Sequence, residues 1–340
     1  MNNFKEKRGL MDVTFINVGY GESILITNQD PNYEDGQFVM LIDGGSALDS
    51  EYTGKSGRIR AYDFLKKKGI RHIDLLAFSH VHEDHTCGLV PIISEIPVKK
   101  YWTTIAIKPE YYGKQVHPDI DLSETNRKAL ASVNDYSLLM EKLQGLDIEW
   151  LDVIHPDYFC EGDLTIDILG PEKGYKESVE ASVSRVFETS TSDELDAAIT
   201  QTTETMNNAS LILRLHYKGK TVLLCGDTNA DGYRHILETN PDLLKADIFK
   251  VGHHGQADSV SEALVRAVDP SVIVCCASND FRSNSSNTKT FETIAHAEGE
   301  KPLVYLFQDG LYNAQWNPDI TPRNGVTVSL DEDGITWQLC

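Results

Sequence analysis

The sequence predicts an α/β fold in which mixed β-sheets are covered by helices on their outer faces. Apolar runs of strand length recur along the chain, helical segments lie between many of them, and hairpin patterns occur near both ends. The 340 residues suffice for one large domain or two ordinary ones, and 41% hydrophobic and 24% charged residues are ordinary values for a globular protein.

Apolar runs bounded by Gly, Asp, Asn and Pro predict the strands. The first run bends at a corner that contains Gly19 and Gly21, so it reads as two strands. A later run turns at residues 218–220 and reads as a hairpin. In chain order, the predicted strands lie in residues 11–27 (two strands), 38–43, 72–80, 98–108, 164–171, 210–227 (two strands), 246–252, 271–278 and 302–307, with a closing hairpin around 331–334.

Amphipathic patterns with suitable ends predict the helices. Gly69 stops the first of them, and Ser123 is a suitable N-cap for the longest. The predicted helices lie in residues 57–70, 87–93, 123–145, 230–238, 259–268 and 288–299. The span 172–207 is rich in Ser, Thr and Glu with only weak helical periodicity, so we expect a mobile loop or lid there. We expect a single domain over residues 10–340 with this span as a polar insertion.

The net charge of −21 limits the partners that the protein can have. Such a surface repels polyphosphates, so we expect no extended nucleic-acid footprint, although bound metal ions can reverse the sign of charge locally. The six cysteines form no CxxC pair, which favours free thiols in a reducing compartment over a disulfide scaffold. No secretory leader and no run long enough to span a bilayer is present, so we expect a soluble, cytoplasmic protein without a membrane partner.

Residues 75–89, LLAFSHVHEDHTCGL, concentrate metal-ligating side chains at the end of a predicted buried strand. His80, His82, Asp84 and His85 follow the pattern H-x-H-x-D-H. Strand alternation places His80 and His82 on one side, and a turn brings Asp84 and His85 toward the same point. Imidazoles and carboxylates at this density suit a borderline divalent metal, above all zinc. A solvated loop with incidental histidines is the less favoured explanation.

Three other predicted strands end in possible partners for this cluster. Asp43 occurs in LIDGGS, Asp227 in LLCGDTN, and His253 and His254 in KVGHHG. Sites in α/β folds assemble at strand ends. An Asp before Gly is by itself a common turn. Together with the histidine cluster, however, these residues favour a shared metal site.

These motifs resemble those of the metallo-β-lactamase superfamily, whose mark is H-x-H-x-D-H followed by a distant Asp and a distant His. Within this superfamily, the chain resembles the soluble lactamase-like domain of the ComEC/Rec2 competence family. The segments that carry this resemblance are INVGYGESILI, LIDGGS, SHVHEDHTCGL, NNASLILRLHYKGKTVLLCGD and IFKVGHHG. The resemblance runs from about residue 10 to 280 and is weaker in the middle. It implies a four-layer αββα sandwich of two mixed β-sheets with a dinuclear metal site on one edge.

The resemblance also implies a role for each candidate residue. Two divalent ions are expected, zinc first and manganese as the alternative. The first ion takes His80 and His82, and the second takes Asp84 and His85. The remaining roles are Asp227 as the bridging carboxylate, His254 as the last ligand with His253 as its alternative, and Asp43 as an acid that orients the cluster from outside.

The sequence departs from the family pattern at the first ion. Many members place a further histidine between the first cluster and the bridging Asp, but His117, His155 and His216 lack a matching context. Asn208 stands near this point of the motif and is a candidate to approach the site. The first ion therefore keeps an open position for water or substrate, as catalytic sites do.

The reaction that this site implies is hydrolysis by a hydroxide that bridges the two ions, with Asp84 as the catalytic residue that orients it. A phosphodiester of a small or short substrate is the first expectation, since the resemblance implies it and the acidic surface disfavours long duplex DNA. A hydrolase of a lactam, lactone or thioester is one alternative. A non-catalytic module that binds a metal or a nucleotide is another.

Overall fold

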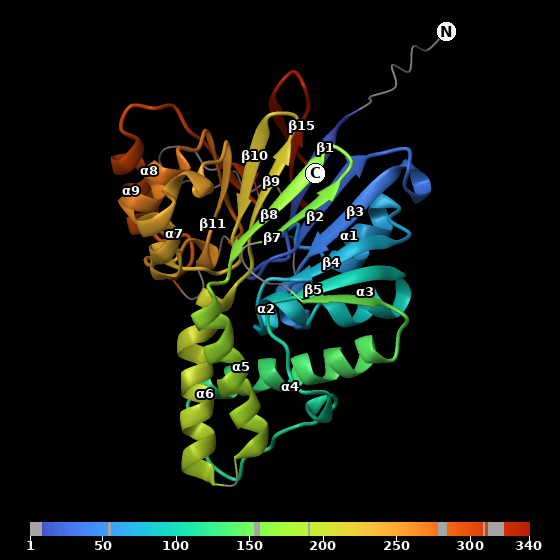
Figure 1. Ribbon diagram of the computed structural model, residues 1–340, viewed down its shortest axis with the longest axis vertical. Helices are drawn as coiled ribbons and strands as arrows, with labels where there is room; N and C mark the ends of the chain where they lie inside the picture. Colours follow the sequence, from blue (N-terminus) through green and yellow to red (C-terminus); the bar gives the residue numbers. More distant parts are fainter. Residues whose placement is uncertain are drawn as a thin grey trace.

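The computed structural model describes residues 9–53, 56–152, 157–189, 191–277, 284–308, 310–311 and 323–340. These residues form two mixed β-sheets that pack face to face, with helices outside each sheet (Figure 1). Across the first sheet the strands are β16 (Ile335–Leu339), β15 (Gly325–Leu330), β1 (Met11–Ile16), β2 (Ile24–Gln29), β3 (Gln37–Ile42), β4 (Ile73–Phe78), β5 (Val98–Thr103) and β6 (Glu149–Asp152). Across the second they are β14 (Gly310–Leu311), β13 (Val304–Phe307), β12 (Val272–Cys275), β11 (Ile248–Val251), β10 (Lys220–Leu224), β9 (Ile212–Tyr217), β8 (Leu164–Gly170) and β7 (Asp157–Glu161).

Each sheet combines an antiparallel part with a parallel part. In the first sheet β1, β2 and β3 pair antiparallel, and β3, β4, β5 and β6 pair parallel. In the second sheet β8, β9 and β10 pair antiparallel, and β10, β11, β12 and β13 pair parallel. The carboxyl ends of β3 and β4 therefore share one edge, as do those of β10 and β11.

Three apolar layers hold the sandwich together. Between the sheets, alternate residues such as Val13 and Phe15 of β1 face residues such as Leu213 and Leu215 of β9, all of them buried. A second layer lies between the first sheet and its helices, and a third between the second sheet and its helices. The structure thus has the four-layer αββα architecture that the sequence predicts.

The helices divide between the two outer faces (Figure 1). Along the first sheet lie α1 (Ala61–Lys68), α2 (Glu83–Thr86), α3 (Leu89–Glu95), α4 (Glu124–Gln144), α5 (Lys173–Glu188) and α6 (Ser192–Met206). Along the second lie α7 (Arg234–Thr239), α8 (Glu262–Val268) and α9 (Thr288–Glu298). Gly69 ends α1 in the left-handed conformation and the Ser123 side chain caps α4, as predicted. None of the described helices is long and apolar enough to cross a membrane.

The expectation of a loop over residues 172–207 is wrong, because α5 and α6 form there. That the span is mobile stays a prediction. Val179, Val183 and Val186 of α5 lie at helical spacing and are buried with Ala198 and Ile199 of α6 in the outer core of the first sheet. The many Ser, Thr and Glu residues between these positions concealed the spacing. The apolar pattern of the sequence also did not predict the strands β6 and β7. That this span is an insertion into the domain stays a prediction.

Candidate metal centre

The loop after β3 is held against the loop after β4 by backbone contacts. The N–H of Gly44 donates to the carbonyl of His85 at 2.7 Å, and the N–H of Gly88 donates to the carbonyl of Gly45 at 2.8 Å. A Cβ atom at Gly88 would collide with the Gly44 carbonyl. The glycines of LIDGGS and HTCGL are therefore required so that the two loops can approach closely enough to place their side chains together.

Side chains from the ends of three strands, β4, β10 and β11, meet at Asp227, which follows β10. The Oδ2 atom of Asp227 lies 3.1 Å from Nε2 of His254, 3.3 Å from Nε2 of His85 and 3.9 Å from Nε2 of His80. Asp84 adds a second carboxylate, whose Oδ2 lies 3.2 Å from Nε2 of His254 and 4.0 Å from Nε2 of His85. The three histidine side chains are fully buried.

Two overlapping groups in this cluster have ligand atoms within 4.8 Å of one another. The first contains His80, His85 and Asp227, and the second contains Asp84, His85 and His254. His85 belongs to both groups. The other predicted ligand, His82, turns its Nδ1 atom toward Nε2 of His80 at 2.8 Å. His82 belongs to neither group, and its contact with His80 connects it to the other five predicted ligands. That His80 and His82 share the first ion stays a prediction.

Each fully buried histidine makes a hydrogen bond on the side of its ring that faces away from the cluster. The Nδ1–H of His85 donates to Oδ2 of Asp43 at 2.8 Å, and that of His254 donates to the carbonyl of Cys276 at 2.7 Å. The Ser79 hydroxyl donates to Oδ2 of Asp43 at 2.5 Å and accepts from Nδ1 of His80 at 3.0 Å. These hydrogen bonds fix the direction of each ring, so that the neutral imidazole presents its Nε2 atom to the cluster, as metal-binding histidines require.

The histidine pKa values separate into two pairs. Burial, with repulsion from the neighbouring histidines, holds the pKa of His80 well below its usual value, and burial lowers the pKa of His82 to about 4. Burial also acts to lower the pKa values of His85 and His254. The charge of Asp227 together with the other carboxylates around each ring (Asp43 and Asp84 for His85, Asp84 for His254) outweighs burial and raises both pKa values well above the usual range.

The two carboxylates are held in the charged form. Burial alone would raise the pKa of each group. The charges of His85 and His254 outweigh it, so that the pKa of Asp84 is about 2 and the pKa of Asp227 is well below its usual value. Both acids are consequently available as charged ligands at any physiological pH.

The donor set fits divalent metal ions. The Oδ1 atom of Asp227 is buried and has no hydrogen-bond partner among the described residues, although Oδ2 faces three histidines. Such a buried oxygen costs free energy unless a ligand satisfies it. Imidazole nitrogens and carboxylate oxygens are the ligands of zinc and of similar borderline metals. His80, His82, Asp84, His85, Asp227 and His254 would hold the ions.

Two further candidates lie outside this cluster. The ring of His253 turns away and contacts Oδ1 of Asp258 at 3.0 Å and Nδ2 of Asn207 at 3.0 Å, so His254 is the better choice for the ligand. Asn208 does not join either metal group; its Oδ1 accepts from the N–H of Asn229 at 3.1 Å and so holds the loop that carries Asp227.

The three histidines considered for the first ion also lie apart from the cluster. The Nε2 atom of His216 on β9 contacts Asp167 of β8 at 2.7 Å, in agreement with a strand-surface position. His117 is exposed to solvent, and His155 lies outside the described residues. Among the residues that the structure describes, neither metal group gains a third histidine from this set.

Sequence reasoning missed a buried ion pair that joins the two sheets behind the cluster. Lys250 of β11 forms an ion pair with Glu22, which precedes β2, and both side chains are inaccessible to solvent. The Nζ atom of Lys250 also donates to the carbonyl of Gly226 at 2.7 Å, and the N–H of Glu22 donates to the carbonyl of Asp84 at 3.1 Å. A lysine inside the apolar run IFKV was the signal that could have revealed this pair.

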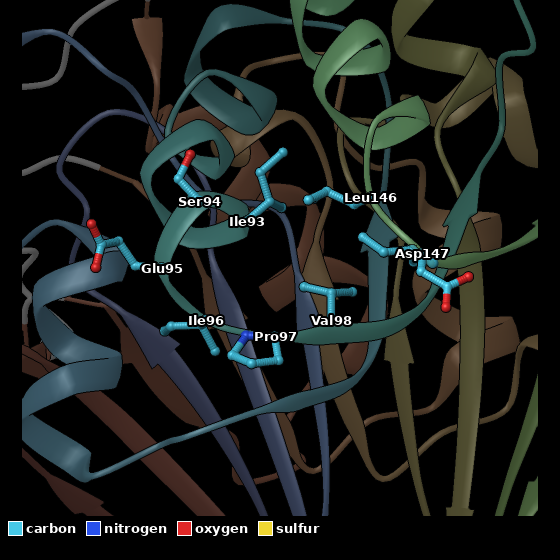
Figure 2. Close-up of a pocket in the computed structure, with 9 residues that line it drawn as sticks. Ile93, Ser94, Glu95, Ile96, Pro97, Val98, Leu146 and Asp147 are labelled. Carbon is cyan, nitrogen blue, oxygen red and sulfur yellow. The ribbon is translucent and has the colours of Figure 1, made fainter.

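The apolar pocket of about 290 Å³ shown in Figure 2 is separate from the metal centre. It is lined by the end of α3, the start of β5 and residues 146–148 before β6. Val98 in its wall begins β5, whereas His80 follows the end of the parallel neighbour β4. The pocket therefore lies at the opposite end of these strands and contributes nothing to the cluster.

Comparison with known sequences agrees with this geometry. A sequence model of the metallo-beta-lactamase superfamily matches residues 18–277, which include every residue of the cluster. The chain belongs to this superfamily. Metallo-beta-lactamase superfamily proteins are, in general, metal-dependent hydrolases that bind divalent ions.

The predicted similarity to the ComEC/Rec2 family is also confirmed. The chain is 23% identical over 292 residues to ComE operon protein 3 of Bacillus subtilis strain 168. The match covers 83% of this chain and 30% of that protein, so the chain spans less than a third of the relative's length.

Solved structures of the superfamily resemble the chain at low sequence identity. YhfI of Bacillus subtilis, a metallo-beta-lactamase fold protein, is 11% identical with a TM-score of 0.43, and the match covers 89% of this chain and 98% of YhfI. Tm1679, described as a metal-dependent hydrolase of the beta-lactamase superfamily, is 15% identical with a TM-score of 0.46, and the match covers 88% and 97% of the two chains.

Proposed function

We propose that this protein is a metal-dependent hydrolase that cleaves a phosphodiester bond in a small or short substrate. The observation that carries the proposal is the set of buried imidazole Nε2 atoms that face Asp227 while each ring is fixed by a hydrogen bond on its other side. Such preorganisation is costly in a buried site and suits ligands that must keep one geometry during turnover.

Two divalent ions bound there would make water a nucleophile at neutral pH and stabilise negative charge on the phosphoryl oxygens. The residues of the chain do the positioning. Asp84, with a side chain 16% exposed against 4% for Asp227, is the carboxylate that solvent reaches more easily. We assign it the role of orienting the attacking water. Asp43 and Ser79 hold the imidazoles of His85 and His80 at the angle at which their Nε2 atoms face the cluster.

Two observations support a short phosphodiester as the substrate. The first is the similarity to ComE operon protein 3, because the resemblance to the ComEC/Rec2 family implies a phosphodiester substrate. The second is the net charge of −21, since an acidic surface repels a long polyanion but imposes a smaller penalty on a short one.

The experiment that tests the proposal combines metal analysis with a substrate panel. The purified protein is analysed for bound metal and assayed with a generic phosphodiester, a phosphomonoester, a β-lactam and a thioester, beside His82→Ala and Asp227→Ala. Phosphodiester turnover that both substitutions abolish is the expected result. Metal-free protein, or activity that neither substitution changes, would contradict a metal-dependent hydrolase. Turnover of only the β-lactam or the thioester would replace the substrate class, and stoichiometric metal without turnover would favour a binding module.

A further inference from the structure

A polar groove of about 810 Å³ lies at the end of the sandwich opposite the metal centre. Strand β2 begins beside the cluster, after Glu22, and ends at Gln29 in the wall of the groove. The groove is formed where the loops after β2, β7, β9 and β15 meet, and these loops belong to both sheets. Its lining residues are Gly9, Asn28, Gln29, Asp30, Pro31, Asn32, Gly36, Gly162, Asp163, Lys218 and Glu332.

An amide group in the wall of this groove lacks a partner. Asn28 is 2% exposed, and its Oδ1 atom has no hydrogen-bond partner among the described residues. Asn28 lines the groove from β2, two residues before Asp30. A buried amide oxygen without a partner is energetically unfavourable. A bound cation or a hydrogen-bond donor at this position would remove that cost.

The carboxylate of Asp30 has one oxygen in use and one directed across the groove. Its Oδ1 atom accepts from the N–H and from the side-chain amide of Asn32, both at 2.8 Å. Its Oδ2 atom lies against the turn between β7 and β8, where a Cβ added to Gly162 would be 2.5 Å away. The glycine thus allows the loop of the first sheet to bring a carboxylate up to the second sheet.

The charges in the groove do not balance. Asp30, Asp163 and Glu332 contribute three negative charges against one positive charge, and Lys218 is paired with Glu332 at 3.0 Å. Within the described parts of the chain, Asp30 and Asp163 have no ion-pair partner. Burial first, and then the charges of Asp163, Asp30 and Glu332, raise the pKa of the adjacent Tyr217 to about 12. The groove therefore has an uncompensated negative field.

We propose that this groove binds a hard divalent cation, calcium, through the amide oxygen of Asn28 and the carboxylate of Asp30. Asp163 and Glu332 add negative charge around the ion. Calcium takes six to eight oxygen ligands from carboxylates, amides, backbone carbonyls and water, and the lining of the groove contains oxygen donors but no His or Cys among its described residues. A bound ion would connect the loops of the two sheets and stabilise the sandwich far from the hydrolytic site.

Terbium(III), a calcium substitute that luminesces when a nearby tyrosine is excited, tests the proposal on the full chain with its metal centre loaded with zinc. Tyr217, which adjoins the groove, is the expected sensitiser. Wild-type protein should show saturable terbium luminescence that calcium displaces, and calcium should raise its melting temperature. Asp30→Asn should weaken terbium binding by about tenfold or more, because it removes a charged ligand. Asn28→Asp should strengthen it, because it adds one.

Asp333→Asn is the matched control. It makes the same change of charge in the turn that carries Glu332, but Asp333 is exposed and does not line the groove. Equal terbium binding by the Asp30→Asn and Asp333→Asn variants would overturn the proposal. Weaker binding by Asn28→Asp would also overturn it, and that variant keeps a readout if Asp30→Asn does not fold. His82→Ala should leave the luminescence unchanged, and its loss there would move the binding to the zinc centre.

Discussion

The imidazole of His85 is held between two carboxylates: its Nδ1 atom lies 2.8 Å from Oδ2 of Asp43, and its Nε2 atom lies 3.3 Å from Oδ2 of Asp227. The Asp43 side chain is fully buried and also accepts from the N–H of Ser79 at 2.8 Å. The outer carboxylate therefore fixes both the tautomer and the direction of the ring, and the inner side of the ring is left for a metal ion.

Asp43→Asn should lower metal affinity by about 10- to 100-fold, because an outer partner that orients a ligand has an effect of this size. The measurement is competition for zinc with a chromogenic chelator. Asp63→Asn on the exposed face of α1 makes the same change of charge and should leave the affinity unchanged. Equal affinities of the two variants would show that Asp43 does not orient the site.

The adjacent histidines of the HHG loop should differ in their effect on metal content. His254→Ala removes a fully buried ring whose Nε2 atom lies 3.1 Å from Asp227, so the protein should lose bound metal. His253→Ala removes a ring that contacts Asp258 and Asn207, and metal content should be retained. Elemental analysis of the purified variants measures the difference. A larger loss of metal in His253→Ala would reverse the assignment.

Lys250→Met should destabilise the fold, because it leaves the carboxylate of Glu22 buried without its counter-charge. The free energy of unfolding should fall by about 3–5 kcal/mol, as measured by chemical denaturation. The double variant with Glu22→Gln should recover much of the loss, since both charges are then absent.

Lys100→Met provides the control for this pair. Lys100 and Glu149 lie 3.4 Å apart with side chains 40% and 56% exposed, so that the change should be at most about 1 kcal/mol. A similar loss of unfolding free energy in the two lysine variants, or no recovery in the double variant, would show that the buried ion pair contributes no more to stability than the exposed one.

Metal binding at pH 7 should release protons. In the metal-free chain the pKa values of His85 and His254 lie well above their usual value, since Asp227 and the neighbouring carboxylates together outweigh burial, so both rings carry an additional proton at neutral pH. Zinc binds only neutral imidazole, so about two protons should leave on binding, and fewer as the pH rises above those pKa values. His82, with a pKa of about 4, contributes none.

Calorimetric titration with zinc in buffers of different ionisation enthalpy measures this number. The apparent binding enthalpy should vary with the ionisation enthalpy of the buffer, with a slope equal to the number of protons released. A binding enthalpy that is independent of the buffer at pH 7 would show that both rings are already neutral in the metal-free protein.

The position of the site could be predicted because its residues follow strands with clear apolar patterns. Asp43, His80, Asp227 and His254 all stand just after runs that read as strands in the sequence, and the parallel pairs β3–β4 and β10–β11 bring those ends to one edge. The choice between His253 and His254 could not be derived from periodicity. Both residues have positive φ, 45° and 49°, in a loop to which the alternation of a strand does not apply.

Features that depend on tertiary contacts were not visible in the sequence. The partner of Lys250 is Glu22, which is distant in the sequence and precedes a strand of the other sheet, so no local pattern joins them. In α5, burial of Val183 depends on a helix packing against the outer core of the first sheet, whereas the composition of the segment resembles a loop. Strand β7 has mostly exposed or half-buried residues and thus lacks the apolar run of a core strand.

The division of the cluster between two sheets also determines when it can form during folding. Asp43 and His85 are 42 residues apart in the sequence, but His85 and His254 are 169 apart and come from different sheets. Closing a loop of that length is entropically expensive and occurs only when the packing of both halves compensates for it. Zinc uptake by a refolding chain should therefore lag behind secondary-structure formation and report the moment at which the two halves dock.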